Sequence, residues 1–334
     1  MFLFDRPLPF PNTHPSTYLP LSKEPVFDAS KHLALEMPSH CMSLADLGYS
    51  PEEINRCASP FAYSDAFRIL SNEGVAAMEV VCQEIYGNRN ESAGTGANRL
   101  GSYARGAGYR SRFIRDFCDS QAVAEHLSKI AGVTLGRHSV PAVACGINYA
   151  PDDINRAVDT WHVDSVNFDV VMMVTDPRDL KGGEFQVFKG TRQEGQELLG
   201  IIGEEGGDAT LPEARISSIP FPEAGYGFLQ QGTHIFHRAC RLLEKAKRIT
   251  LIPSYEVLPA HDTDSTNAIN MADWTDPGIS AELARHEVWR ASARLEQLLS
   301  DINLNDEPRA LGSSIRKAVS QLNQFADKLE SHSQ

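Results

Sequence analysis

The chain has 334 residues, a formal net charge of −13 and a hydrophobic content of 42%. These values are typical of a globular protein with a sizeable core, and they exclude a mainly disordered chain. No apolar run reaches the roughly 18 residues that a membrane span needs, and the acidic balance argues against nucleic acid as the main partner, because phosphate binding is driven by a basic surface.

The cysteines and the N-terminus both point to a reducing environment. The six cysteines are scattered and none forms a CxxC pair, so we expect buried free thiols rather than disulfides or a cysteine zinc site. The N-terminus carries Asp5 and Arg6 inside its short apolar stretch and continues into prolines, which is not the pattern of a secretion signal. We therefore expect a cytoplasmic protein.

Residues 1–140 are expected to form an N-terminal arm and a helical region packed on the core. The first 60 residues are rich in proline and predict an extended arm with a short helix near Pro51–Arg56. Two longer helices are predicted at Ser71–Tyr86 and Ser120–Ala131. Between them, Glu91–Arg115 reads as a loop rich in glycine and arginine.

After residue 140 the pattern changes to short apolar segments separated by Gly, Pro or Asp. We expect strands at Pro141–Tyr149, Val158–Asp164, Phe168–Thr175, Glu184–Phe188, Ala214–Ile219, Tyr226–Gln231, His234–Ala239 and Arg248–Val257. This series predicts a mainly β fold with flanking helices, whose core at residues 141–258 is a double-stranded β-helix, or jelly roll. The acidic, glycine-rich segment 190–222 is expected to be an insertion or a lid.

Residues 259–334 return to helical periodicity. Helices are predicted at Ser280–Ile302 and Gly312–Ser331. An apolar stripe along the second helix favours packing on one of the sheets.

The strongest chemical signal is the segment Trp161-His162-Val163-Asp164. On a strand, residues two apart point to the same face, so His162 and Asp164 can offer an imidazole and a carboxylate to one metal. A third ligand is available from His234 or His237. Two histidines and one carboxylate form the facial triad of non-haem Fe(II) oxygenases. The alternative is that these histidines are hydrogen-bonded core residues.

Arg248 begins an otherwise apolar strand, and Thr250 follows it on the same face. A buried guanidinium needs an anionic partner, which the dicarboxylate 2-oxoglutarate would supply. The charges of Fe(II), Asp164, 2-oxoglutarate and Arg248 in such a site sum to zero. The alternative is an arginine that pairs with an acidic loop at the surface.

Five motifs occur in the order found in one enzyme family. They are Ile147-Asn148-Tyr149, His162-Val163-Asp164, Gly182-Gly183-Glu184-Phe185-Gln186-Val187, His237-Arg238-Ala239 and Arg248-Ile249-Thr250. Together they resemble the Fe(II)/2-oxoglutarate-dependent oxygenases, especially the isopenicillin N synthase-like group. Thr250 replaces the usual serine, and Ala150 stands where many members have a second tyrosine.

The resemblance implies a role for each matching residue. His162, Asp164 and His237 correspond to the iron ligands, and His237 is favoured over His234 because Arg238 follows it. Arg248 and Thr250 correspond to the residues that hold the far carboxylate of 2-oxoglutarate. Asn148 and Tyr149 are further candidates for co-substrate contacts.

The activity implied is oxidation of a C–H bond of a small molecule, using Fe(II), 2-oxoglutarate and O2, by hydroxylation, desaturation or ring closure. Arg105, Arg110 and Arg112 could hold the carboxylate of an amino acid or peptide-like substrate, or could form a solvated loop that pairs with the acidic insertion. Two other functions stay open: a non-haem iron oxidase that uses no 2-oxoglutarate, and a non-catalytic jelly-roll binding protein.

Overall fold

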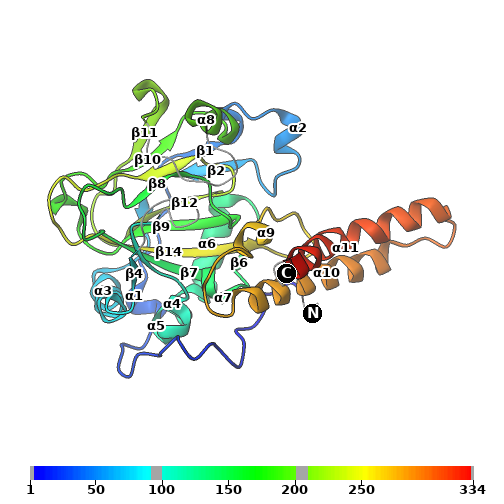
Figure 1. The fold of residues 1–334 in the computed structure, drawn as a ribbon, viewed down its shortest axis with the longest axis horizontal. Helices are drawn as coiled ribbons and strands as arrows, with labels where there is room; N and C mark the ends of the chain where they lie inside the picture. Colours follow the sequence, from blue (N-terminus) through cyan, green and yellow to red (C-terminus); the bar gives the residue numbers. More distant parts are fainter. Residues whose placement is uncertain (1–3, 92–99, 201–209, 332–334) are drawn as a thin grey trace.

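The computed structural model describes residues 4–91, 100–200 and 210–331. Two antiparallel sheets dominate this part of the chain (Figure 1). The large sheet has the order β1-β2-β12-β9-β14-β7-β5-β4, with β3 paired to β12 and β6 paired to β14; the small sheet has the order β11-β10-β13-β8. The strands of the large sheet are β1 Cys41–Ser43, β2 Phe61–Ser64, β3 Phe67–Arg68, β4 Asn90–Glu91, β5 Ser102–Ala104, β6 Leu135–Arg137, β7 Cys145–Tyr149, β9 Phe168–Met173, β12 Tyr226–Gln230 and β14 Ile249–Val257. Those of the small sheet are β8 Asp159–His162, β10 Phe185–Phe188, β11 Ile216–Ile219 and β13 His237–Ala239.

All eight strands predicted after residue 140 are present, as β7 to β14. The first is shorter than expected, because Pro141–Ala144 forms the helix α7 before β7 begins at Cys145. Pro141 stands in the first turn of α7, where a helix does not need the missing amide hydrogen. Mainly antiparallel sheets with flanking helices are therefore confirmed.

Side chains along β7 and β14 alternate between the face that packs on helices and the opposite face of the large sheet. Ile147, Tyr149 and Leu251 belong to the core cluster that packs the large sheet against helices. Asn148 and Thr250 lie between them in sequence and are register partners across the β7–β14 pairing. They point to the opposite face, because successive side chains of a strand alternate.

Helices from the first part of the chain cover the outer face of the large sheet. They are α1 Ala29–His32, α3 Asn72–Tyr86, α4 Ala107–Arg110, α5 Arg112–Cys118 and α6 Gln121–Ala131. The short helix α2 Pro51–Ile54 lies elsewhere, beside β1, and its Ile54 packs on the cluster of Phe185, Val187 and Phe228 (Figure 1). The core cluster joins side chains of α3, α5 and α6 to those of β7, β9 and β14. Strands from before and after residue 140 thus share one sheet.

The prediction of a loop at Glu91–Arg115 is wrong for its described residues, which are Glu91, in β4, and residues 100–115. This segment forms β5, α4 and the start of α5. The Ser111 hydroxyl accepts a hydrogen bond from the Ile114 amide and caps α5, whose Phe113 and Phe117 are buried. Residues 92–99 lie outside the described part. In the 190–222 segment, the described residues include the helix α8 Arg192–Leu199, which a Thr191–Glu194 capping box begins.

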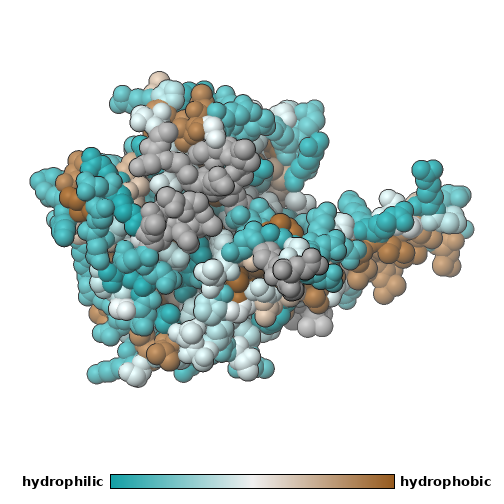
Figure 2. Space-filling model, in the orientation of Figure 1, coloured by the Kyte–Doolittle hydropathy of each residue, from teal (hydrophilic) through white to brown (hydrophobic). Residues whose placement is uncertain are grey.

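The prediction that the C-terminal helices pack on a sheet holds only in part: the first long helix contacts β14 through His286 and Arg290, whereas the second packs on other helices. The short helix α9 spans Ala268–Met271, and the long helices α10 Ile279–Asp301 and α11 Pro308–Ser331 form a hairpin that projects from the body (Figure 1). The C-terminal part of the apolar stripe of α11 packs against α9 and α10, where Phe325 contacts the cluster of Met271 and Leu283, but Ile315 near the start of the stripe is 49% exposed. Hydrophobic residues lie along one side of the projecting hairpin (Figure 2). None of the described helices is long and apolar enough to cross a membrane.

Candidate metal centre

The facing surfaces of the two sheets enclose a pocket. The small sheet contributes residues such as His162, Phe185 and His237, and the large sheet contributes residues such as Asn148 and Thr250. Asp164 lies two residues after His162, just beyond the end of β8, and also lines the pocket. The strands thus bring together side chains that are far apart in the sequence.

His162, Asp164 and His237 converge in this pocket. The Nε2 atom of His162 lies 3.3 Å from one carboxylate oxygen of Asp164, and the Nε2 atom of His237 lies 3.4 Å from the other. One ligand atom from each of the three residues lies within 4.8 Å of the others. Two imidazoles and one carboxylate at this separation can coordinate a single metal ion.

Backbone carbonyls fix the tautomer of both histidines. Nδ1 of His162 donates to the carbonyl of Thr160 at 2.6 Å, and Nδ1 of His237 donates to the carbonyl of Ile235 at 2.8 Å. A carbonyl can only accept, so Nδ1 carries the hydrogen in both rings and each Nε2 presents a lone pair. This orientation of a histidine by a second hydrogen bond is typical of metal ligands.

The carboxylate of Asp164 is held from several sides. Its backbone amide donates to the carbonyl of Gly232, and Nε2 of Gln230 lies 3.1 Å from its Oδ2 atom. The same amide nitrogen of Gln230 reaches both carboxylate oxygens of Asp169. Burial, reinforced by the charge of Asp164, raises the pKa of Asp169 well above its ordinary value. Gln230 and Asp169 thus help to orient the carboxylate of Asp164.

His234 is directed away from this group. Its Nε2 atom lies 3.2 Å from the Sγ atom of Cys57, and its Nδ1 atom lies 2.9 Å from the hydroxyl of Thr233. Burial lowers the pKa of His234 to about 4, so its ring is neutral at pH 7. The structure therefore places His237, and not His234, beside His162 and Asp164.

Three of the four residues expected to contact 2-oxoglutarate line the pocket: Asn148, Arg248 and Thr250. The fourth, Tyr149, faces the core, where its hydroxyl donates to the carbonyl of Cys82 at 2.7 Å. Adjacent residues of a strand face opposite sides, so Asn148 and Tyr149 cannot both reach the pocket.

Arg248 is buried with an unused donor. Its side chain is 2% exposed, and Nε donates to the carbonyl of Gly183 at 3.2 Å. Its Nη1 atom is buried and has no hydrogen-bond partner among the described residues. Burial lowers the pKa of Arg248 to about 10, which leaves it charged at pH 7. Burying a charged donor without a partner costs free energy, which an anionic acceptor bound in the pocket would offset.

The three arginines proposed for substrate binding are separated. Arg105 lines the pocket, and its Nη1 atom lies 2.6 Å from a carboxylate oxygen of Asp276. Arg110 packs its guanidinium over the ring of Tyr18, and Arg112 is exposed at the start of α5. Neither of these two lines the pocket, so only Arg105 is placed to contact a molecule there.

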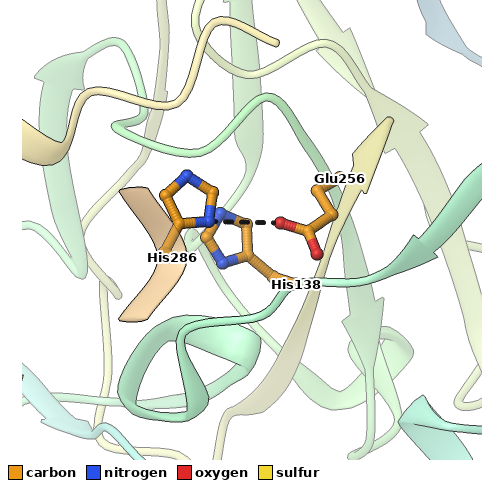
Figure 3. A group of neighbouring side chains, drawn as sticks. All are labelled: His138, Glu256 and His286. Atoms are coloured by element: carbon orange, nitrogen blue, oxygen red, sulfur yellow. Dashed lines mark ion pairs between the residues drawn. The ribbon is translucent and has the colours of Figure 1, made fainter. Parts of the chain in front are cut away.

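A second group of buried ligand-type residues lies outside the pocket: His138, Glu256 and His286 (Figure 3). Nδ1 of His286 lies 3.4 Å from a carboxylate oxygen of Glu256, and the hydroxyl of Ser139 lies within 3.0 Å of both groups. Nδ1 of His138 accepts from the amide of Val140, and burial lowers the pKa of this ring to about 4.

These hydrogen bonds connect α10 to β14. His286 belongs to α10 and Glu256 to β14, and the ring of His138 stacks on that of His286 with centroids 5.3 Å apart. Because Ser139 already bridges His286 and Glu256, we interpret the group as a buried polar contact between the hairpin and the sheet. A charged residue inside the apolar strand Ile249–Val257 was the only signal in the sequence.

Several residues around the centre were not predicted. Gln230, Asp169 and Gly232 surround Asp164, and Trp274 lines the pocket from the segment before α10. Gln230 and Asp169 are polar residues in apolar strands, which was a usable signal. Nothing in the sequence links Trp274 to the metal ligands.

No family model matches the chain, and no curated protein matches it. Among solved structures, similar ones include the non-haem α-ketoglutarate-dependent carbocyclase SnoK from nogalamycin biosynthesis, with 14% identity over 66% of this chain and 90% of that chain and a TM-score of 0.43. The epimerase SnoN, solved with Fe3+, α-ketoglutarate and nogalamycin RO, has 12% identity over 62% and 84% of the two chains and a TM-score of 0.40. A prolyl-4-hydroxylase from Pseudomonas putida has 11% identity over 58% and 91% and a TM-score of 0.39.

These neighbours are iron- and α-ketoglutarate-dependent enzymes or hydroxylases of the kind that the sequence motifs resemble. With TM-scores below 0.5 they do not assign a function to this chain. The side chains of the pocket carry the assignment instead.

Proposed function

We propose that the chain is an Fe(II)- and 2-oxoglutarate-dependent oxygenase that oxidises a C–H bond of a small molecule, by hydroxylation, desaturation or ring closure. One observation carries the proposal. His162, Asp164 and His237 present two lone-pair nitrogens and a carboxylate within 4.8 Å of one another, in a pocket that also holds a buried arginine with an unused donor.

The two sheets are proposed to form a double-stranded β-helix. The strand orders β12-β9-β14-β7 and β11-β10-β13-β8 support this, because successive strands from β7 to β14 alternate between the sheets except at the β10–β11 hairpin. In such a fold the two sheets face each other, which supports placing the metal-binding site in the pocket between them.

The donor set fits ferrous iron. A triad of two imidazoles and one carboxylate leaves coordination positions open for other molecules, which suits non-haem Fe(II). His162 and His237 would bind through Nε2, since Nδ1 of each ring is already engaged by a carbonyl. Asp164 would bind through its carboxylate, which Gln230 holds in place.

The other half of the pocket fits 2-oxoglutarate. Arg248 has a buried charge and an unpaired Nη1 donor, and Thr250, two residues later in β14, lines the same pocket. Arg248 and Thr250 would hold the carboxylate remote from the metal, with Asn148 beside them. Iron and 2-oxoglutarate, when bound, supply the chemistry that uses O2 to oxidise a C–H bond.

The protein's own contribution is orientation and exclusion of water. Phe185 stacks on the ring of His237 with centroids 5.1 Å apart. On the other side of the small sheet, Trp161 stacks on Phe236 and anchors the strands that carry the two histidines. These contacts keep the ligands rigid and limit access of water.

Two observations favour this function over the alternatives. The unused donor of Arg248 supports a dicarboxylate co-substrate over an oxidase that needs none. The fixed tautomers of His162 and His237 support metal binding over a purely structural role. The proposal therefore keeps both the metal and the co-substrate.

The test is anaerobic titration with Fe(II) and then 2-oxoglutarate, followed by admission of O2. We expect one iron per chain, a visible charge-transfer absorption when 2-oxoglutarate is added, and succinate after O2 enters. The H162A variant should fold and lose all three signals. Normal iron content and succinate formation in H162A would refute the proposed centre.

A further inference from the structure

Besides the proposed metal ligands and the residues proposed to hold 2-oxoglutarate, the pocket is lined by Tyr103, Arg105 and Trp274, which we call the wall. Tyr103 belongs to β5 and is the register partner of Asn148 on β7. Trp274 comes from the segment between α9 and α10. The wall therefore adjoins the residues proposed to hold 2-oxoglutarate, but contains none of them.

The charge of this wall is neutralised within the protein. Nη1 of Arg105 lies 2.6 Å from Oδ2 of Asp276, and the two side chains are only 12% and 9% exposed. A carboxylate and a guanidinium at this distance, shielded from water, compensate each other's charge. Arg105 is thus not a free cation that waits for an anionic substrate.

The wall is also flat and aromatic. The guanidinium carbon of Arg105 lies 3.6 Å from the ring centroid of Trp274 and 5.0 Å from that of Tyr103. Such stacking holds the flat guanidinium against the face of the indole and restricts the movement of both groups. Val143 and Val166, which pack with Trp274 in one cluster, continue this surface along the pocket.

We propose that Tyr103, Arg105 and Trp274 bind the substrate, and that the substrate is an uncharged molecule with a flat, conjugated face. The proposal rests on the function proposed above, because it assigns Arg248 to 2-oxoglutarate. Among the described residues, the arginine and lysine side chains that line the pocket are Arg105, paired with Asp276, and Arg248. An anionic substrate would therefore meet no uncompensated arginine or lysine, whereas an aromatic face would stack on the wall.

This substrate class differs from the amino acid or peptide-like molecule expected from the sequence. That expectation required Arg105, Arg110 and Arg112 to act together on a carboxylate. Only Arg105 reaches the pocket, and its charge is already paired with that of Asp276. The residues that recognise the substrate are instead aromatic.

The test uses two probes of matched shape, 2-naphthol and 2-naphthoate, the second of which carries a carboxylate at pH 7. Binding of each is measured calorimetrically to the anaerobic protein loaded with Fe(II) and saturating 2-oxoglutarate. We expect the wild type to bind 2-naphthol at least tenfold more tightly than 2-naphthoate. W274A should weaken 2-naphthol binding at least tenfold, and W274F should change it less than threefold.

The D276N variant tests the charge argument with little change of shape. It leaves the guanidinium of Arg105 uncompensated, so we expect 2-naphthoate to bind at least threefold more tightly and 2-naphthol to change less than twofold. Equal binding of the two probes to the wild type, or no change in D276N, would overturn the proposal; if W274A does not fold, D276N decides alone. Failure to bind Fe(II) and 2-oxoglutarate would instead count against the proposed function.

Discussion

His162 and His237 are register partners across the β8–β13 pairing, and their ring centroids lie 4.1 Å apart. Each ring is oriented by the carbonyl two residues before it, Thr160 for one and Ile235 for the other. The two proposed ligands are thus held by separate hydrogen bonds. Removing one ring should leave the orientation of the other intact.

The first prediction contrasts His237 with its near neighbour His234. H237A should lower iron affinity at least a hundredfold, because it removes one of the three proposed ligands. H234A should retain iron, since His234 contacts Cys57 and Thr233 on the opposite side. Iron content after anaerobic dialysis checks both variants, and loss of iron from H234A with retention in H237A would reverse the assignment.

The second prediction concerns Gly232, which leaves room for the carboxylates behind the centre. A Cβ atom at this position would lie 2.6 Å from Oδ2 of Asp164 and 2.6 Å from Oδ1 of Asp169. G232A should therefore displace Asp164 and reduce iron affinity at least tenfold, with a smaller effect on the melting temperature. The matched control is G87A, because a Cβ atom there meets nothing within 4 Å; equal iron affinity in the two variants would contradict the prediction.

The third prediction concerns the unused donor of Arg248. R248A removes a charged hydrogen-bond donor whose net contribution is about 1.5 to 3 kcal/mol, so the concentration of 2-oxoglutarate at half-maximal binding should rise about ten- to a hundredfold. Iron affinity measured without 2-oxoglutarate should stay unchanged. R178A is the control, because Arg178 is exposed and pairs only with Asp176 among the described residues. An unchanged 2-oxoglutarate requirement in R248A would place the co-substrate elsewhere.

The fourth prediction concerns the pH dependence of stability through Glu282, a buried residue of α10. Its carboxylate accepts from the hydroxyl of Tyr109 and the amide of Ala142, but burial raises its pKa from 4.5 to about 7. Between these two pH values the folded protein holds a proton that the unfolded chain releases. The contribution of Glu282 to the free energy of unfolding is therefore fully present below pH 4.5 and is lost as pH rises through about 7.

The E282Q variant should not show this loss of stability with rising pH. Relative to the wild type, its free energy of unfolding should increase between pH 4.5 and pH 8, by about 3 kcal/mol at most. Urea denaturation at several pH values measures the difference. The low-pH end is an internal control, because both side chains are neutral there; a difference that does not vary with pH would refute the assignment.

Most of the core strands, and the grouping of the proposed metal ligands, could be predicted from the sequence because both depend on local alternation. The strands β7 to β14 are short apolar runs between turn residues, and the His162–Asp164 spacing needs no tertiary information. The same alternation could have excluded Tyr149, since Asn148 precedes it on the same strand and faces the pocket.

The remainder depends on packing that no single segment encodes. An apolar stripe on α11 shows that one face is buried, but not that α9 and α10 bury it. The glycine and arginine content of residues 91–115 favoured a loop, so the helical spacing of Phe113, Ile114 and Phe117 in α5 was not recognised. The contact of Trp274 with Arg105 joins two segments that are far apart in the sequence, and only the folded chain reveals it.

The pairing of β2 with β12 has a consequence for synthesis of the chain on the ribosome. Tyr63 pairs with Gln230, and β6 pairs with β14. A nascent polypeptide thus carries the strand Phe61–Ser64 with only β1 as a partner until residue 230 has emerged, and such an exposed strand edge promotes aggregation. Fragments that end before β12 should be poorly soluble, and renaturation should be slow, because the large sheet closes only when distant parts of the chain meet.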